Sequence, residues 1–315
     1  MTQYSKGGLH RYCVILAGGD GKRLRQLTQC VSDDARPKQF CPFWAGLTPL
    51  RATRHRAALS LDPKRTVFVV TRAHEGYYAD ELADVRPWQV LIQPDNKGTA
   101  PAILLSLLHL ENLDPGASVV FLPSDHHYGD EHGFLAAVHR AFESAEERAQ
   151  GPILLGASPT HPEADYGWIE PGPLVETEGR SDLFHVMRFW EKPSLTAARI
   201  LFNRGCLWNT FVMVGRVRAF LEMIQRATPH LYDNFARHET TSGQFDSERL
   251  YETLEPVDFS RDILAQSPAQ LAVMNTGPVG WSDLGEPERV IRLISQLDLK
   301  CDWLDNWHRS GSYAS

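Results

Sequence analysis

The sequence predicts an α/β protein with a doubly wound mixed sheet. Five short apolar runs are continuous rather than alternating, which is typical of strands buried on both faces. Longer helical patterns with recognisable start signals lie between these runs. Strand–helix alternation of this kind predicts βαβ units, with helices covering both faces of the sheet.

The expected strands fall into two groups. The continuous apolar runs span residues 12–17, 66–70, 88–93, 118–124 and 152–157. Three further segments, 165–172, 183–193 and 206–215, are separated by Gly, Pro and acidic turns. These later segments predict a mixed extension of the same sheet, so the whole arrangement is expected to be Rossmann-like but not purely parallel.

Helix starts are marked by capping residues and glycines. Thr48 followed by Pro49 is a typical N-cap and first-turn pair, and Ser194 is a second N-cap candidate. Gly98-Thr99 and Gly133 precede two longer apolar patterns. The helices expected after these four starts span residues 50–59, 195–203, 100–112 and 134–149.

Composition excludes several classes of protein. The formal net charge is -7 over 315 residues, so no overall basic field indicates a nucleic-acid partner. Five cysteines without CxxC spacing argue against a disulfide framework or a zinc site and favour a reducing cytoplasm. No signal peptide or membrane span is expected. We expect one domain over residues 9–298 and a frayed C-terminal tail over 299–315.

A glycine-rich basic loop follows the first predicted strand. It differs from a P-loop, because Arg23 stands where Ser or Thr should follow Lys22. It also differs from a dinucleotide fingerprint, because Leu24 replaces the third glycine. A tight turn with solvated charges is one interpretation. The alternative is an anion nest of backbone N–H groups, to which Arg23 and Lys38 add positive charge.

Motifs in a fixed order indicate a family. The segment LAGGDGKRL at 16–24, followed by RPKQF at 36–40, resembles the signature of sugar-1-phosphate nucleotidyltransferases, nearest to the mannose-1-phosphate guanylyltransferases. Further segments follow in the family's order: QPDNKGTAPAI, LPSDH, DYGWIE, FWEKP, LWN and GWSDLG. The resemblance implies a GT-A-like nucleotidyltransferase fold. It also implies transfer of a nucleotidyl group from a nucleoside triphosphate to a sugar-1-phosphate.

The resemblance also implies roles for individual residues. The expected catalytic residues are Arg23, Lys38, Asp125 and Lys192. The expected nucleotide-binding residues are Leu16, Ala17, Gly18, Gly19, Gly21, Lys22, Gln93, Gly98 and Thr99. The expected sugar-binding residues are Gly167, Glu191 and Asn209, for which a strand-end charge and simple bulges or turns are the alternatives. Asp125 and Asp283 are the expected ligands of Mg²⁺ as cofactor.

The position of Asp125 predicts a ligand site independently of the resemblance. It directly follows an apolar run, and ligands of open α/β sheets bind at the carboxyl ends of strands. The alternative role is N-cap of the next helix. The adjacent His126 and His127 do not predict zinc, because neighbouring histidines rarely converge on one metal and no third ligand has the required spacing.

Specificity is where the motifs disagree. Lys97-Gly98-Thr99-Ala100 stands where guanylyltransferases usually have Arg-Asn-Thr-Ala, and it is closer to uridylyl- and thymidylyltransferases. We predict GTP and mannose-1-phosphate as the preferred small-molecule substrates. The alternatives are UTP or dTTP with another hexose-1-phosphate, or a catalytically silent regulator that binds nucleotide-sugars. A homodimer is one expectation for the assembly.

Overall fold

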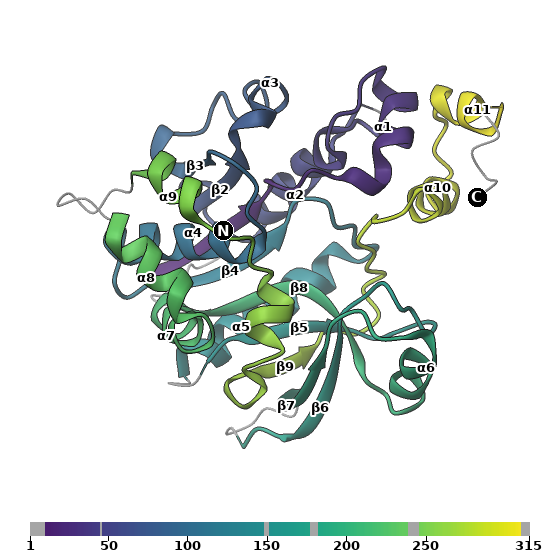
Figure 1. Ribbon diagram of the computed structural model, residues 1–315. Coiled ribbons are helices and arrows are strands. Elements are labelled where there is room, and N and C mark those ends of the chain that lie inside the picture. The colour runs from purple at the N-terminus through teal and green to yellow at the C-terminus, as the bar shows by residue number, and fades with distance from the viewer. Residues whose placement is uncertain (1–9, 45, 148–150, 177–181, 239–245, 310–315) are drawn as a thin grey trace, which may run out of the picture.

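A mixed sheet of nine strands crosses the described part of the molecule (Figure 1). The computed structural model describes residues 10–44, 46–147, 151–176, 182–238 and 246–309. The strands are β1 Arg11–Leu16, β2 Thr66–Thr71, β3 Val90–Gln93, β4 Ser118–Pro123, β5 Ile153–Ala157, β6 Trp168–Leu174, β7 Leu183–Trp190, β8 Leu207–Arg216 and β9 Ala272–Asn275. Their order across the sheet is β3-β2-β1-β4-β8-β5-β9-β7-β6.

The sheet has a parallel half and a mixed half. Strands β3, β2, β1 and β4 are parallel neighbours, so their carboxyl ends lie along one edge. Strand β8 runs antiparallel to both β4 and β5, and β6 and β7 form an antiparallel pair beyond β9. Strand β6 also pairs with β8 through Trp168 and Trp208. The predicted mixed α/β sheet is therefore confirmed.

Helices cover both faces of this sheet, as Figure 1 shows. One face packs against α4 and α7, with Leu104 and Phe220 among the buried contacts. The other face packs against α2 and α5, where Leu50 and Phe134 are buried. The helices are α1 Arg25–Ser32, α2 Pro49–Ala58, α3 Glu75–Tyr78, α4 Thr99–Leu113, α5 Glu131–Glu147, α6 Leu195–Asn203, α7 Val217–Ala227, α8 Pro229–His238, α9 Ser247–Thr253, α10 Pro287–Gln296 and α11 Asp302–Arg309.

The predicted helix starts are confirmed where side-chain capping was expected. The Thr48 hydroxyl accepts a hydrogen bond from the backbone N–H of Arg51 at the start of α2. The Ser194 hydroxyl accepts one from the N–H of Ala197 at the start of α6. No helix or strand was predicted at the positions of α7, α8, α9 and β9. Their apolar residues are buried by tertiary packing, which local patterns do not reveal.

The expectation of a frayed tail over 299–315 is wrong for its central part. Residues 302–309 form α11, which lies beside α1 and α10 in Figure 1. Trp303 and Trp307 are four residues apart, so they share one helix face, and both are buried in a small apolar cluster with Leu27 and Leu293. Residue 9, where the domain was expected to begin, and residues 310–315 lie outside the described part of the chain.

Candidate active site

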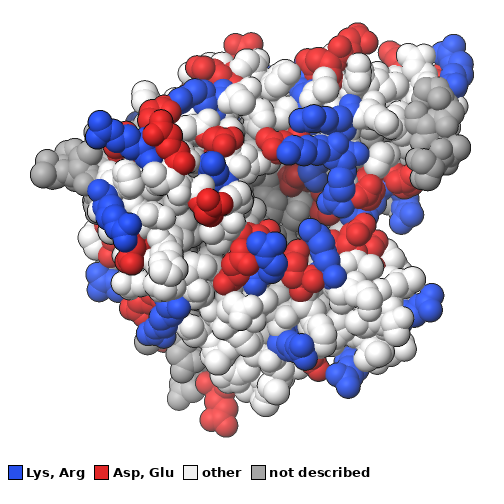
Figure 2. Space-filling model, viewed as in Figure 1, with Lys and Arg blue, Asp and Glu red and all other residues white. Residues whose placement is uncertain are grey.

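A cavity of about 430 Å³ opens at the carboxyl edge of the parallel half of the sheet. Seven of the predicted site residues line it: Leu16, Gly18, Gly19, Gln93, Gly98, Thr99 and Asp125. The segments after β1, β3 and β4 therefore meet there, as expected for a ligand site in an open α/β sheet. Figure 2 shows a hollow on this face of the molecule, with Lys, Arg, Asp and Glu side chains gathered along its rim.

The glycine loop after β1 exposes backbone donors and buries its acceptors. Gln39 donates its side-chain N–H groups to the carbonyls of Ala17 and Gly19, at 3.0 and 2.7 Å. Thr71 donates its hydroxyl to the carbonyl of Gly18 at 2.9 Å. Within the described residues, the N–H groups of Gly18 and Gly19 donate to no protein acceptor. The loop thus holds carbonyls inward and leaves amides available, which suits an anion.

Two of the loop glycines are required by their surroundings. A Cβ at Gly18 would lie 2.7 Å from Nε2 of Gln93, closer than side chains tolerate. Gly21 has a φ of +59°, and a Cβ there would lie 2.8 Å from the backbone nitrogen of Lys38. Gly19 has open space around it. The loop therefore packs directly against the RPKQF segment at Gly21.

Lys38 joins the two aspartates that were expected to bind metal. Its Nζ lies 2.8 Å from Oδ2 of Asp125 and donates to the backbone carbonyl of Asp283 at 3.0 Å. The loops that carry the aspartates are held together because His127 and Ser282 form an isolated antiparallel bridge. Helix α5 begins at Glu131, where Asp130 accepts from the N–H of Gly133, so Asp125 is not an N-cap.

The carboxylate of Asp283 is held by a buried cluster. Its Oδ1 accepts from the Tyr166 hydroxyl at 3.1 Å, from Nη1 of Arg289 at 2.7 Å and from the N–H of Gly285 at 2.9 Å. Arg289 is shared with Glu163 at 2.9 Å. Burial alone would raise the pKa of Asp283, but the charges of Lys38 and Arg289 outweigh it and lower that pKa. Asp283 is therefore ionised at neutral pH.

The donor set fits Mg²⁺ in part. Within the described residues, Oδ2 of Asp283 and Oδ1 of Asp125 accept no hydrogen bond from the protein, which leaves one oxygen on each carboxylate for a cation. No group of three or more His, Cys, Asp or Glu side chains in those residues could hold a metal alone. Mg²⁺ commonly takes one or two carboxylates and completes its shell with phosphate oxygens and water.

The loop cations lie outside the cavity lining. Arg23 is about half exposed, at 52%, and its Nη1 lies 2.6 Å from Oε1 of Glu286. It therefore faces the segment that follows Asp283. Lys22 is 73% exposed and its Nζ lies 3.6 Å from Oδ2 of Asp20. Arg23 is thus placed near the aspartate pair, whereas Lys22 is directed at solvent.

The predicted sugar-binding residues lie together beside the cavity. The N–H of Asn209 donates to the carbonyl of Gly167 at 2.8 Å, and a Cβ at Gly167 would lie 3.2 Å from Oε2 of Glu191. Nζ of Lys192 lies 3.5 Å from Oε1 of Glu191. Burial raises the pKa of Glu191. Oδ1 of Asn209 accepts from the N–H of Phe211, a cavity residue, so the cluster adjoins the cavity.

The segment after β3 is clamped against residues 257–259. The N–H of Phe259 donates to the Thr99 hydroxyl at 2.8 Å, and the N–H of Val257 donates to the carbonyl of Lys97 at 3.0 Å. Gly98 has a φ of +90°, and a Cβ there would lie 2.4 Å from the carbonyl oxygen of Val257. Only glycine permits this close approach.

The amide of Gln93 has a fixed orientation. Its Oε1 accepts from the buried Tyr251 hydroxyl at 3.0 Å, while its Nε2 lies on the side of Gly18 in the cavity wall. The amide therefore presents a donor to the cavity. Tyr251 lies far along the chain, and no local signal in the sequence pairs it with Gln93.

Sequence reasoning missed several residues that line the cavity. These are Gln39, Val69, Asn96, Ala102, Pro123, Ser124, His126, Phe211, Asp258 and Ser260. Gln39 was within reach, because it belongs to the RPKQF motif. Burial lowers the pKa of His126 to about 4, and Nε1 of Trp281 donates to its Nδ1 at 3.1 Å. His126 is therefore a neutral residue of the cavity wall at neutral pH.

The fold and the site geometry first indicate a class of protein. They are typical of α/β proteins that bind a phosphorylated ligand at the carboxyl ends of parallel strands. The chain belongs to the nucleotidyl transferase family, whose sequence profile matches residues 12–298. No helix in the described residues has the length and apolar character needed to cross a membrane.

The chain is similar to several proteins with related names. It is 30% identical to the mannose-1-phosphate guanylyltransferase RfbM of Salmonella typhimurium, over 86% of this chain and 56% of that protein. It is 31% identical to the xanthan biosynthesis protein XanB of Xanthomonas campestris, over 90% of this chain and 59% of that protein. The chain therefore spans a little over half the length of these relatives.

A solved structure shares the fold. The crystal structure described as mannose-1-phosphate geranyltransferase from Thermus thermophilus has a TM-score of 0.77 and 30% identity, covering 90% of this chain and 79% of that one. A Helicobacter pylori structure described as mannose-6-phosphate isomerase has a TM-score of 0.68 and 22% identity, covering 87% of this chain and 100% of that one. The second likeness concerns the fold alone.

Proposed function

We propose that the protein transfers a nucleotidyl group from a nucleoside triphosphate to a sugar-1-phosphate, with GTP and mannose-1-phosphate preferred. The observation that carries this proposal is the convergence of the glycine loop and Asp125 at one cavity, where Lys38 links Asp125 to the backbone carbonyl of Asp283. The strand order β3-β2-β1-β4 is that of Rossmann-like nucleotide-binding sheets. A volume of about 430 Å³ is within the usual range for small-molecule sites.

The chemistry needs positioning and charge neutralisation. An oxygen of the sugar-1-phosphate forms its bond to the α-phosphorus as the bond from that phosphorus to pyrophosphate breaks. The attacking oxygen is already ionised at neutral pH, so no general base is required. The free amides of Gly18 and Gly19 would hold triphosphate oxygens, and Lys38 and Arg23 would neutralise charge that moves to pyrophosphate.

Asp125 and Asp283 would hold Mg²⁺ together with phosphate oxygens and water. The cation supplies charge neutralisation and orientation of the triphosphate when it is bound. The cluster of Arg289, Tyr166 and Gly285 fixes one oxygen of Asp283, so the other oxygen has a defined direction. This arrangement supports two-carboxylate binding.

The orientation of Gln93 bears on the base. A donor facing the cavity matches a keto oxygen, which guanine, uracil and thymine all carry, and mismatches the amino group of adenine. Gln93 therefore favours GTP, UTP or dTTP over ATP and does not separate the three. The preference for guanine and mannose rests on the name of the similar protein RfbM, a mannose-1-phosphate guanylyltransferase.

The test is a matrix of nucleoside triphosphates against sugar-1-phosphates, scored by pyrophosphate release. We expect the largest kcat/KM with GTP and mannose-1-phosphate, and the smallest with ATP. A larger kcat/KM for UTP or dTTP would move the protein to another branch of the same chemistry. Absence of pyrophosphate release with every pair, in a protein that still binds GTP, would favour the silent regulator instead.

A further inference from the structure

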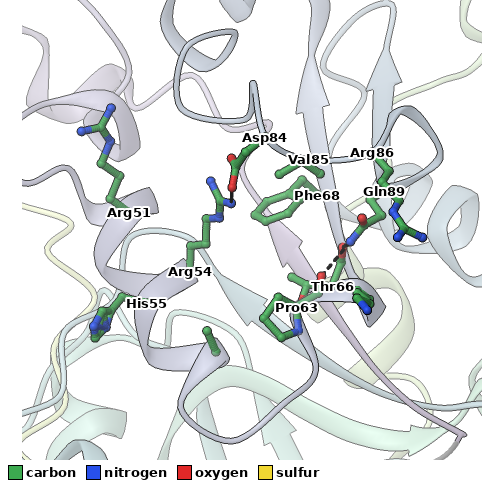
Figure 3. A pocket seen from close by; sticks show the side chains of 12 residues that line it. Arg51, Arg54, His55, Pro63, Thr66, Phe68, Asp84, Val85, Arg86 and Gln89 are labelled. Atoms are coloured by element: carbon green, nitrogen blue, oxygen red, sulfur yellow. Dashed lines mark hydrogen bonds and ion pairs between the residues drawn. The ribbon is translucent and has the colours of Figure 1, made fainter.

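A second cavity, of about 570 Å³, lies on the other side of the parallel half of the sheet (Figure 3). Helix α2, strand β2 and the segments around 63–66 and 84–89 form its walls. It shares no lining residue with the candidate active site. Phe68 lines this cavity and the next residue, Val69, lines the other, and successive strand residues point to opposite faces. The two cavities are therefore separated by the sheet.

The rim of this cavity is strongly basic. It carries four Lys and Arg side chains, one His and a single carboxylate, in a chain whose net charge is -7. These residues are Arg51, Arg54, Lys64, Arg86, His55 and Asp84. The local excess of positive charge has the opposite sign to the whole molecule, so the cavity would attract a small anion.

Part of that charge is not neutralised by the protein. Arg54 pairs with Asp84 and donates to the carbonyl of Glu81 at 2.7 Å, as Figure 3 shows for the first pair. Arg51 lies 3.9 Å from Oε2 of Glu81. The ion pairs of this cavity are those of Arg51 and Arg54, so within the described residues the exposed side chains of Lys64 and Arg86 have no acidic partner. Two cations are therefore available to a ligand.

The accessible apolar lining consists of Ala58, Pro63 and Val85, whereas Phe68 is only 2% exposed and lies under the guanidinium of Arg54. Phe68 and Val85 lie at the centre of Figure 3, with Arg51 and Arg86 on opposite sides. Nε2 of the buried Gln89 donates to the carbonyls of Pro63 and Thr66, at 2.8 and 2.6 Å, which fixes the wall beneath Lys64. An apolar lining with a cationic rim matches a molecule that has a flat apolar body and a phosphate.

We propose that this cavity is a second binding site, for a nucleoside phosphate, separate from the candidate active site. The aromatic base would lie against Val85 and Pro63, and the phosphates would contact Lys64 and Arg86. Binding there is independent of the reaction proposed above, because no group assigned to that reaction lines this cavity.

Equilibrium dialysis with GDP as the probe tests the site. We expect two GDP molecules per chain in the intact protein and one in the double variant Lys64→Glu/Arg86→Glu, with kcat/KM for the transferase reaction unchanged. The two side chains are exposed and unpaired among the described residues, so their reversal should not prevent folding.

A matched control reverses two exposed cations elsewhere. Arg199 on α6 and Arg292 on α10 also have no acidic partner among the described residues. The variant Arg199→Glu/Arg292→Glu changes the net charge equally and should keep two GDP sites. One GDP per chain in the intact protein that is retained in Lys64→Glu/Arg86→Glu would overturn the proposal. Two sites retained in Lys64→Glu/Arg86→Glu, or one site lost equally in the control, would also overturn it.

Discussion

The two halves of the sheet build their parts of the candidate active site from different groups. In the parallel half, the groups proposed to face the ligand after β1 are backbone amides, which stay available because Gln39 and Thr71 bond to the loop carbonyls. In the mixed half, the groups proposed to face the ligand are the side chains of Glu191 and Asn209, which strand pairing brings together around Gly167. The first arrangement suits phosphates, and the second suits sugar hydroxyls. Changes in the first should affect the chemical step, and changes in the second should affect sugar-phosphate binding.

The largest effect is expected for Asp125→Asn. Loss of this carboxylate removes one of two proposed Mg²⁺ ligands and the partner of Lys38. We expect kcat to fall about a thousandfold or more, equivalent to roughly 4 kcal/mol of barrier. Excess chelator should abolish pyrophosphate release by the intact enzyme, and added Mg²⁺ should restore it.

Asp130→Asn is the control for this change. Asp130 lies in the same connection between β4 and α5, and its Oδ1 accepts from the N–H of Gly133. Asparagine can keep that capping bond, so activity should stay normal. Full turnover of Asp125→Asn, or equal losses in both variants, would contradict the metal assignment and remove the distinction between the two halves.

Arg23→Ala should have the next largest effect. A cation that faces the transferring phosphates contributes about 3 kcal/mol to the barrier, so kcat/KM for GTP should fall roughly a hundredfold. Its ion pair with Glu286 is partly exposed and should contribute less than about 1 kcal/mol to folding. Glu286→Gln removes the same ion pair but keeps the cation, so it should retain activity. If Arg23→Ala lowers the melting temperature but leaves kcat/KM unchanged, the role of Arg23 is structural rather than catalytic.

Gly21→Ala and Gly19→Ala form a matched pair within one loop. Alanine at 21 is strained by the φ of +59° and by the Lys38 nitrogen 2.8 Å from its Cβ, whereas alanine at 19 meets no atom within 4 Å. We expect Gly21→Ala to cost about 1–3 kcal/mol of stability and roughly tenfold in kcat. Gly19→Ala should change stability by less than about 0.5 kcal/mol. Equal melting temperatures for the two variants would show that the loop does not pack as described.

Much of the fold was predictable because its signals are local. Continuous apolar runs identified β1, β2, β4 and β5, and the capping hydroxyls of Thr48 and Ser194 marked two helix starts. The strand expected over 88–93 begins at Val90, because a 3₁₀ turn over Pro87–Gln89 precedes it. Helix α11 was not predicted because most of its residues are polar. Its two tryptophans, four positions apart, are buried only through tertiary packing with α1.

The candidate site also has parts that local motifs predict and parts that depend on tertiary contacts. Lys38 and Asp125 lie in short motifs, and the structure joins them at 2.8 Å. The sequence could not predict that Arg289 and Tyr166 would hold Asp283, or that Tyr251 would orient Gln93, because these partners come from distant segments. Motifs therefore predicted several of the groups that gather at the candidate site. The contacts that orient those groups depend on how the whole sheet is assembled.

The smallest expected effect is for Glu191→Gln, in the mixed half. Burial raises the pKa of Glu191 above its ordinary value of 4.5, so folding disfavours the charged form. Its contribution to stability is full below about pH 4.5 and is lost as the pH rises through the raised pKa. The variant should therefore melt at a higher temperature than the intact protein at pH 7, with the difference shrinking toward pH 5.

The KM of Glu191→Gln for mannose-1-phosphate should rise severalfold while its KM for GTP stays constant, because glutamine replaces one acceptor with a donor. Glu170→Gln, on β6 and paired with Arg204, removes a carboxylate outside the cluster and should leave both KM values unchanged. A rise in the KM for GTP instead would mean that the mixed half also binds the nucleotide.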